Sequence, residues 1–190
     1  MCTAGANAQV RSMKSRDYKA AITAATAKTA ASQPRLETYT DADGSITSTE
    51  EFAKDGTYRM TVGAWSRTYD GNGQLRKPSV YIILGVGGKY YNRQDDGPWG
   101  CADPPQEWSF GREQHRRYSV QKRTAGGVSQ TVYKLTFYFK SKRYHADTIV
   151  DTQGRIYQVR KMNGAHKTYD YDAVVTPFAA PDVPCSLPAK

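Results

Sequence analysis

The residues of this chain that are best suited to covalent chemistry are its three cysteines, Cys2, Cys101 and Cys185. Their spacing includes no CxxC or other close pair, which argues against a zinc site or a redox dithiol. Cys101 and Cys185 each lie in a proline-bearing segment, where a helix or a central strand is disfavoured. We therefore predict a Cys101–Cys185 disulfide, with two buried thiols as the alternative. A disulfide is typical of an exported protein.

The third cysteine, Cys2, stands at a position suited to lipid attachment. It follows Met1 and precedes a run of small and polar residues, 3–9, without the apolar segment of a signal peptide. Mature bacterial lipoproteins begin at a lipidated cysteine that is followed by such a tether. We therefore interpret Cys2 as the lipidated first residue of a mature lipoprotein whose signal peptide has been removed. Acyl chains such as palmitate would anchor it to the outer face of the cell membrane. The alternative is a chance cysteine in a cytosolic protein.

Groupings of residues typical of enzymes are not evident in the sequence. The three histidines lie among charged residues without ligand spacing, and there is no Gly-x-Ser-x-Gly motif. The segment Gly85–Tyr90 resembles a phosphate loop only at first sight, because Ser or Thr does not follow its lysine. The aspartates of residues 41–47 do not match EF-hand spacing. We therefore expect no enzyme activity, no metal and no cofactor.

Basic side chains are the remaining candidates for binding chemistry. Lys and Arg total 27 against 18 Asp and Glu, a net charge of +9 that attracts anions of any class. Two basic clusters stand out, and if they are functional we expect them to contact phosphate on lipid headgroups or wall polymers. A solvated surface is the alternative, and nucleic acid is not expected to meet an exported chain. The predicted anion-binding residues are Arg112, Arg116, Arg117, Lys140, Lys142 and Arg143, with Lys122 and Arg123 beside them.

Glycine turns divide most of the chain into short strands that must position these residues. A tether over residues 1–13 is predicted to be disordered. A helix is predicted over residues 14–32, an alanine- and threonine-rich segment in which Tyr18, Ile22, Ala25 and Thr29 recur as one helical stripe. Beyond it, repeated Asp-Gly turns separate alternating runs, which is typical of hairpins. Strands are expected over residues 36–40, 46–53, 57–65, 80–86, 89–92, 118–123, 128–139, 148–151, 155–161 and 168–175.

These elements predict an α+β fold in a single domain over residues 14–190. We expect one strongly curved antiparallel sheet, a half-open barrel, packed against the long N-terminal helix and a short second helix over residues 107–115. With 14 Tyr in the chain, the core must be built largely from amphipathic aromatic residues.

Three short motifs resemble segments of a known lipoprotein family. Thr148–Val159 resembles its "strand, Asp-x-x-Gly-Arg-hydrophobic, strand" hairpin, and Tyr169–Pro181 resembles its closing strand. Gly88–Tyr91 followed by Gly97–Trp99 is similar to its "glycine, lysine, Tyr-Tyr, then Trp" segment. With the Cys2 tether and the helix, the chain resembles actinobacterial lipoproteins of the LppX, LprA, LprF and LprG type, relatives of LolA and LolB. The resemblance implies a barrel-like fold that encloses an apolar cavity and carries lipids or lipoglycans.

The function expected from this resemblance is that of a membrane-anchored, extracytoplasmic lipoprotein. It would bind or carry a lipid or another amphiphilic ligand in a cavity between the helix and the curved sheet. The alternative is a surface interaction module that docks a protein or an anionic cell-wall polymer and has a solid core. Because side chains alternate between the two faces of a strand, the same residues point inward whether the core is hollow, as in a carrier, or solid, as in a module. The predicted ligand-binding residues are Tyr58, Met60, Val62, Ile82, Leu84, Tyr133, Leu135 and Phe137.

Overall fold

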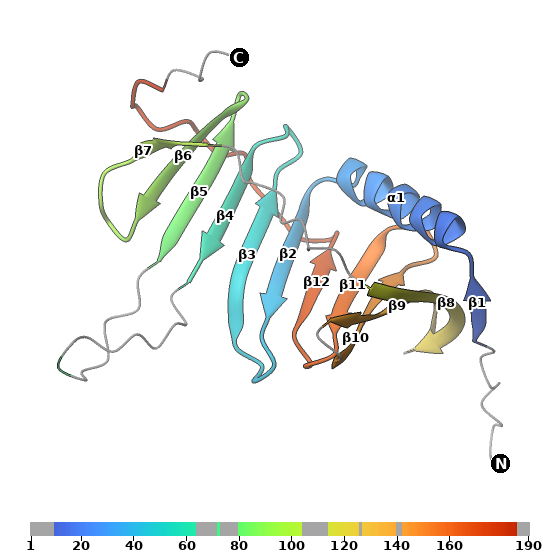
Figure 1. Ribbon diagram of the computed structural model, residues 1–190. Coiled ribbons are helices and arrows are strands. Elements are labelled where there is room, and N and C mark those ends of the chain that lie inside the picture. Colours follow the sequence, from blue (N-terminus) through green and yellow to red (C-terminus); the bar gives the residue numbers. More distant parts are fainter. Residues whose placement is uncertain are drawn as a thin grey trace. The chain divides into compact units, whose positions relative to one another are not determined.

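The computed structural model describes residues 10–63, 72, 80–103, 114–125, 127–139 and 142–185 (Figure 1). These residues contain the helix α1 (Ser15–Ala31) and twelve strands. The strands are β1 (Arg11–Met13), β2 (Arg35–Thr40), β3 (Ile46–Phe52), β4 (Tyr58–Val62), β5 (Tyr81–Val86), β6 (Lys89–Gln94), β7 (Gly100–Ala102), β8 (Gln114–Ala125), β9 (Val128–Phe139), β10 (Lys142–Val150), β11 (Ile156–Lys161) and β12 (His166–Asp170).

The expected α+β half-open barrel is wrong. Strands make up 53% of the described residues and helix only 12%, so this part of the chain is mainly β. The hydrogen-bonded strand order is β1-β8-β9-β10-β11-β12-β2-β3-β4-β5-β6-β7, which leaves β1 and β7 as edge strands and the sheet not closed into a barrel. Most of these strands are added by hairpins, each beside its predecessor, and hairpin turn signals do not bring the two edges together.

The expected second helix over residues 107–115 is also wrong at its C-terminal end. Gln114 and His115 belong to β8, while residues 107–113 lie outside the described part of the chain. β8 pairs with β9 from Gln114↔Tyr138 to Ala125↔Val128, with one irregularity near the start of β8. These ladder hydrogen bonds favour the extended conformation over a helix at the end of the expected segment.

Contacts divide the chain into two compact units, although the sequence predicts one domain. Unit 1 comprises residues 1–32 and 109–166, and unit 2 comprises residues 33–108 and 167–190. Within unit 1, Arg11–Met13 pair with β8, so the last part of the expected disordered tether is a strand. Residues 1–9 lie outside the described part of the chain.

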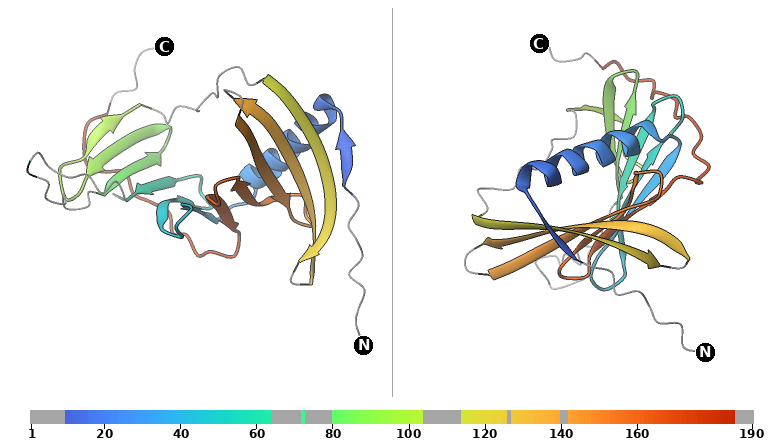
Figure 2. Two further views of the ribbon diagram at one scale, coloured as in Figure 1. Left: turned by 60° about the horizontal axis from the view of Figure 1, so that its bottom comes forward. Right: turned by 90° about the vertical axis from the view of Figure 1, so that its right-hand side faces the viewer.

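Unit 1 is a sheet with α1 lying over one face (Figure 2). The buried residues of α1 are Tyr18, Ala25 and Thr29, on the stripe that the sequence predicts. The Tyr18 ring lies 4.7 Å from that of Tyr118 on β8 and 6.4 Å from that of Tyr133 on β9, measured between centroids. One large aromatic residue therefore joins the small-residue stripe of the helix to the sheet.

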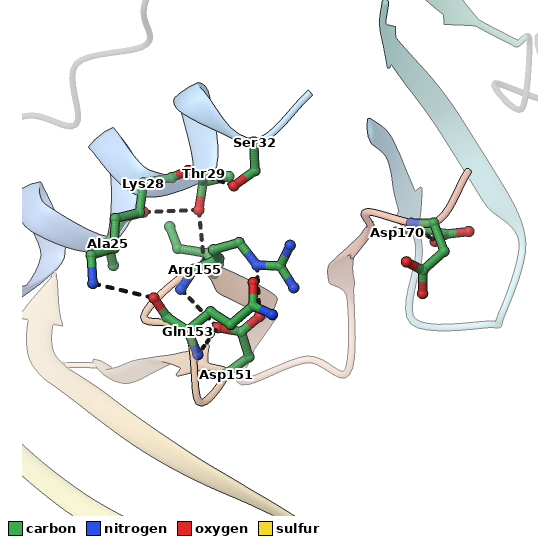
Figure 3. Close-up of polar contacts among 10 residues, drawn as sticks. Ala25, Lys28, Thr29, Ser32, Asp151, Gln153, Arg155 and Asp170 are labelled. Carbon is green, nitrogen blue, oxygen red and sulfur yellow. Dashed lines mark hydrogen bonds and ion pairs between the residues drawn. The ribbon is translucent and has the colours of Figure 1, made fainter. Parts of the chain in front are cut away.

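Polar contacts attach the C-terminal turn of α1 to the β10–β11 turn (Figure 3). The backbone N–H of Ile156 donates to Thr29 Oγ1 at 2.8 Å, and Lys28 Nζ donates to the carbonyl oxygen of Gln153 at 3.2 Å. Gly154 has a φ of 81°, and a Cβ at this position would lie 2.7 Å from Lys28 Nζ. The positive φ accounts for glycine in this turn, and the Lys28 side chain lies over it.

Unit 2 is a sheet with two faces of different character, which the strand register defines. One cross-strand row contains Arg59, Leu84, Tyr91 and Cys101, and Leu84 and Tyr91 are both buried. The C-terminal segment lies along these strands, since the backbone N–H of Phe178 donates to Thr57 Oγ1 at 3.0 Å and Arg59 stacks on the Phe178 ring at 4.6 Å. The neighbouring row projects from the opposite face.

Candidate functional site

The predicted ligand-binding residues of unit 2 do not share one face of the sheet. Tyr58, Met60 and Val62 alternate along β4 and point to the same side, and Ile83 is the cross-strand partner of Met60. Ile82 and Leu84 therefore project from the opposite side, where Leu84 lies across from Arg59. The five residues cannot line one cavity in this register.

Among the predicted ligand-binding residues of unit 1, Tyr133 contacts the helix. Tyr133, Leu135 and Phe137 occupy the face of β9 that carries the Tyr18 contact, and all three are half-buried. Phe137 stacks on Tyr144 of β10 with ring centroids 5.4 Å apart. Tyr133 is thus packed against α1, and Phe137 against the neighbouring strand β10.

The face of the unit 1 sheet that points away from α1 carries several basic side chains beside the buried residues Val132, Ile149 and Gln158. In its cross-strand rows, Lys134 lies between Ser119 and Asp147, and Arg160 follows Asp147. Other basic residues of β8 and β10 lie in neighbouring cross-strand rows and project from the same side as Lys134. We call this surface the basic face, and its described residues are Arg117, Arg123, Lys134, Arg143 and Arg160, with Asp147 as the carboxylate among them.

Most of the basic side chains of this face are accessible to a ligand, while Arg123 is half-buried and donates to Gln130 Oε1. Arg117, Arg143 and Arg160 are exposed, and the Lys134 side chain keeps 43% of its surface accessible although its Nζ lies 3.6 Å from Asp147. Arg117 on β8 and Arg143 on β10 are separated by one intervening strand, which corresponds to about 10 Å. The arrangement can contact several anionic groups along an extended ligand.

The predicted anion-binding residues only partly coincide with the basic face. Arg117 and Arg143 belong to it, while Lys142, the partner of Phe139, projects from the helix-bearing side. Arg116 is exposed beside the irregularity in β8, and Arg112 and Lys140 lie outside the described residues. Sequence reasoning missed Lys134 and Arg160, although Lys134 alternates with the apolar residues of β9 and so had to face away from them.

Unit 2 contains a charged cluster that was not anticipated from the sequence. Glu37 on β2 accepts a hydrogen bond from Arg35 Nε at 2.6 Å and is also paired with Lys167 of β12. Lys167 Nζ contacts Glu50 on β3 at 3.2 Å. The side chains of Arg35 and Glu37 are only 7% and 5% exposed. We call Arg35, Glu37, Glu50 and Lys167 the ionic cluster.

Burial and neighbouring charges shift the pKa values of Glu50 and Lys167 in opposite directions. Burial raises the pKa of Glu50, against the effect of Lys167. Burial alone would lower the pKa of Lys167, but the Glu37 carboxylate and then Tyr169 and Glu50 reverse this, and the pKa is raised. Lys167 therefore stays protonated at neutral pH, which makes it unsuitable as a nucleophile or a general base.

A pocket of about 540 Å³ lies on the same side of the unit 2 sheet as the ionic cluster. Phe52, Tyr58 and Tyr90 contribute aromatic rings to it, and Gln33 and Lys89 contribute polar groups. We call it the aromatic pocket. Its complete lining is Gln33, Phe52, Gly56, Tyr58, Gly85, Val86, Gly87, Gly88, Lys89 and Tyr90.

Comparison with known proteins assigns no function to the basic face, the ionic cluster or the aromatic pocket. No family model, curated protein or solved structure matches this chain. The resemblance to LppX-type lipoproteins thus stays a prediction from its motifs, and a function must be inferred from the residues of the chain.

Neither a metal-binding cluster nor a membrane-spanning helix is found among the described residues. Among the described residues, no three His, Cys, Asp or Glu side chains gather where they could hold a metal ion. The helix in the same part of the chain lacks the length and apolar character of a transmembrane segment.

The structure places Cys101 and Cys185 at disulfide distance, with their Cα atoms 5.5 Å apart. We expect that unreduced protein purified from an oxidising compartment will yield a linked peptide containing both residues in mass-spectrometric mapping. Unlipidated protein should be alkylated at Cys2 alone before reduction, because only that thiol is then free. Alkylation of Cys101 and Cys185 without reductant would contradict the pairing and weaken the inference of export.

Proposed function

We propose that this protein is a surface interaction module that docks an anionic cell-wall polymer on the basic face of unit 1. The observation that carries the proposal is the strand register, which aligns basic side chains from β8, β9, β10 and β11 on one side of the sheet. Because Asp147 is the carboxylate among the described residues of this face, its charge favours an anionic partner.

The placement of the predicted cavity residues favours the module over a lipid carrier. Met60 and Leu84 project from opposite sides of the unit 2 sheet, and Tyr133 packs against Tyr18 in unit 1. A carrier requires a continuous apolar lining, since an acyl chain must be shielded from water along its length. The described contacts give that function less support than the basic face gives to polymer docking.

Arginine is well suited to the proposed contact. Its guanidinium group can donate two parallel hydrogen bonds to one phosphate or carboxylate, and Arg117, Arg143 and Arg160 supply three such groups. An extended polymer can meet them in succession, and release of its counterions would make the binding dependent on salt.

The proposed location of the module follows from Cys2, which lies outside the described residues. Lipidation at Cys2 would hold the chain at the outer face of the cell membrane, where phosphate-bearing wall polymers are within reach. The basic face would then add a second, electrostatic attachment to the acyl anchor.

Removing three charges from the basic face should abolish most of the polymer binding. We expect the triple variant Arg117→Gln, Arg143→Gln, Arg160→Gln to bind long-chain polyphosphate about 100-fold more weakly, at about 1 kcal/mol for each lost cation. The slope of log affinity against log salt should fall by about 0.7 for each lost phosphate contact. Fluorescence anisotropy at several salt concentrations measures both quantities.

The helix-bearing side of the same sheet provides a matched control. Arg11, Lys122 and Lys142 are exposed on that side, and Arg11→Gln, Lys122→Gln, Lys142→Gln removes the same charge from the chain. This control should lose less than threefold in affinity. Equal losses in both triples would show that net charge, and not the basic face, governs binding. Equal affinity of the wild type for single-stranded DNA would likewise contradict a site for wall polymers.

A further inference from the structure

We propose that the aromatic pocket of unit 2 is a saccharide-binding site. Its aromatic residues occupy one cross-strand row, because Phe52 pairs with Tyr58, Tyr58 with Gly85, and Gly85 with Tyr90. Directly opposed residues of antiparallel strands project from the same face of the sheet. Three rings from three strands are thereby brought to one side.

Gly85 leaves room for the rings of Tyr58 and Tyr90 over β5, and with Phe52 these rings form the aromatic floor of the pocket. A Cβ at this position would lie 3.2 Å from Cε1 of Tyr90 and 3.4 Å from Cδ1 of Tyr58. The two tyrosine rings thus approach the glycine from both neighbouring strands and cover its backbone. On the other side of Tyr58, the Phe52 ring lies 4.9 Å away between centroids, at an interplanar angle of 39°. Glycine weakens a strand interior, so its presence here is accounted for by this close approach.

Polar groups accompany the aromatic floor. Gln33 and Lys89 line the pocket, and the backbone of the β5–β6 turn at Gly87 and Gly88 adjoins them. Both turn glycines have positive φ, 58° and 77°, so the tight turn depends on glycine at these positions. Burial raises the pKa of Tyr58, which keeps its hydroxyl protonated and able to donate a hydrogen bond.

The combination selects the chemistry of the ligand. A sugar ring presents C–H groups on its faces, which pack on aromatic rings, and hydroxyl groups at its edge, which exchange hydrogen bonds with amide, ammonium and backbone groups. An acyl chain would offer no hydrogen-bond partner to the polar groups of Gln33 and Lys89 that line the pocket. The lining therefore fits a saccharide better than a lipid, and the volume of about 540 Å³ is within the range of small-ligand sites.

This site is separate from the basic face, since all its lining residues belong to unit 2. The proposal consequently does not depend on polymer docking by unit 1. Each can fail without the other.

The test uses the full chain on an array of soluble oligosaccharides that includes neutral, amino and acidic sugars, followed by titration calorimetry with the best-bound glycan. We expect the wild type to bind at least one of them and Tyr90→Leu to bind it at least tenfold more weakly. Leucine keeps an apolar side chain on β6 but removes the ring that stacks. Lys89→Ala, at the margin of the pocket, should weaken binding severalfold and provides a second variant if Tyr90→Leu does not fold.

Two controls make the outcome decisive. Tyr157→Leu replaces an exposed tyrosine of unit 1 and should leave the affinity unchanged, as should the triple variant of the basic face. The proposal would be overturned if the wild type bound no glycan on the array, or if Tyr90→Leu and Lys89→Ala both bound as tightly as the wild type. Binding of free nucleotides in the pocket in place of glycans would overturn it in favour of base stacking.

Discussion

Replacing Lys167 with methionine should lower the free energy of unfolding by about 3–5 kcal/mol. The Lys167 side chain is 13% exposed, and its ammonium group contacts both Glu37 and Glu50. Methionine has a similar apolar stem but removes the charge. Two carboxylates would then face the one remaining cation, Arg35, in a region that water does not reach freely. An uncompensated buried charge costs far more than an intact buried pair contributes.

Urea unfolding of Lys167→Met checks this expectation. The exposed Lys161 gives the control, since Lys161→Met should change stability by less than about 0.5 kcal/mol. The double variant Lys167→Met, Glu37→Gln should recover part of the loss, because Glu50 and Arg35 then balance in charge. A loss below about 1 kcal/mol in Lys167→Met would show that the ionic cluster is solvated and contributes little.

The ionic cluster also determines how stability responds to alkaline pH. The pKa of Lys167 is raised above its ordinary value of 10.5, so the folded state holds this proton more tightly than the unfolded state. The associated stability is fully present below pH 10.5 and is lost as the pH rises through the raised pKa. Part of the alkaline loss in stability should therefore be absent in Lys167→Met.

Much of the local structure could be predicted from the sequence. The Asp-Gly turns correctly separated β2 from β3 and β3 from β4, and the predicted strand 128–139 coincides with β9. The helix 15–31 agrees with the expected 14–32 because small buried residues recur at helical spacing and Pro34 ends the segment. Turns, single strands and helices depend on residues that are close in sequence, so a sequence pattern can predict them.

Features that depend on strand register could not be predicted. β5 has the sequence Tyr-Ile-Ile-Leu-Gly-Val and is apolar on both sides. The alternation of polar and apolar residues therefore does not predict which face of the sheet carries Ile82 and Leu84. Only pairing with β4 and β6 determines which side each residue faces. The same holds for the ionic cluster, since Lys167 is more than a hundred residues away from Glu37 and Glu50 in sequence.

A second large loss of stability is expected for Tyr18→Ala, at about 3–5 kcal/mol. Tyr18 is 9% exposed and contacts the rings of Tyr118 and Tyr133, and burial raises the pKa of its hydroxyl. The other buried residues of α1 are Ala25 and Thr29, which are small. Most of the apolar area that the buried residues of the helix contribute to the sheet therefore comes from this one side chain.

The variant Tyr18→Phe separates the contribution of the ring from that of the hydroxyl at this position. It keeps the ring and removes only the hydroxyl, so it should cost no more than about 1 kcal/mol. Thermal and urea unfolding of both variants, followed by far-ultraviolet circular dichroism, measure the loss and report whether α1 remains helical. If Tyr18→Ala were no less stable than Tyr18→Phe, the helix would have to be held by its C-terminal polar contacts with Gln153 and Ile156, and Tyr18 would not be the anchor of α1.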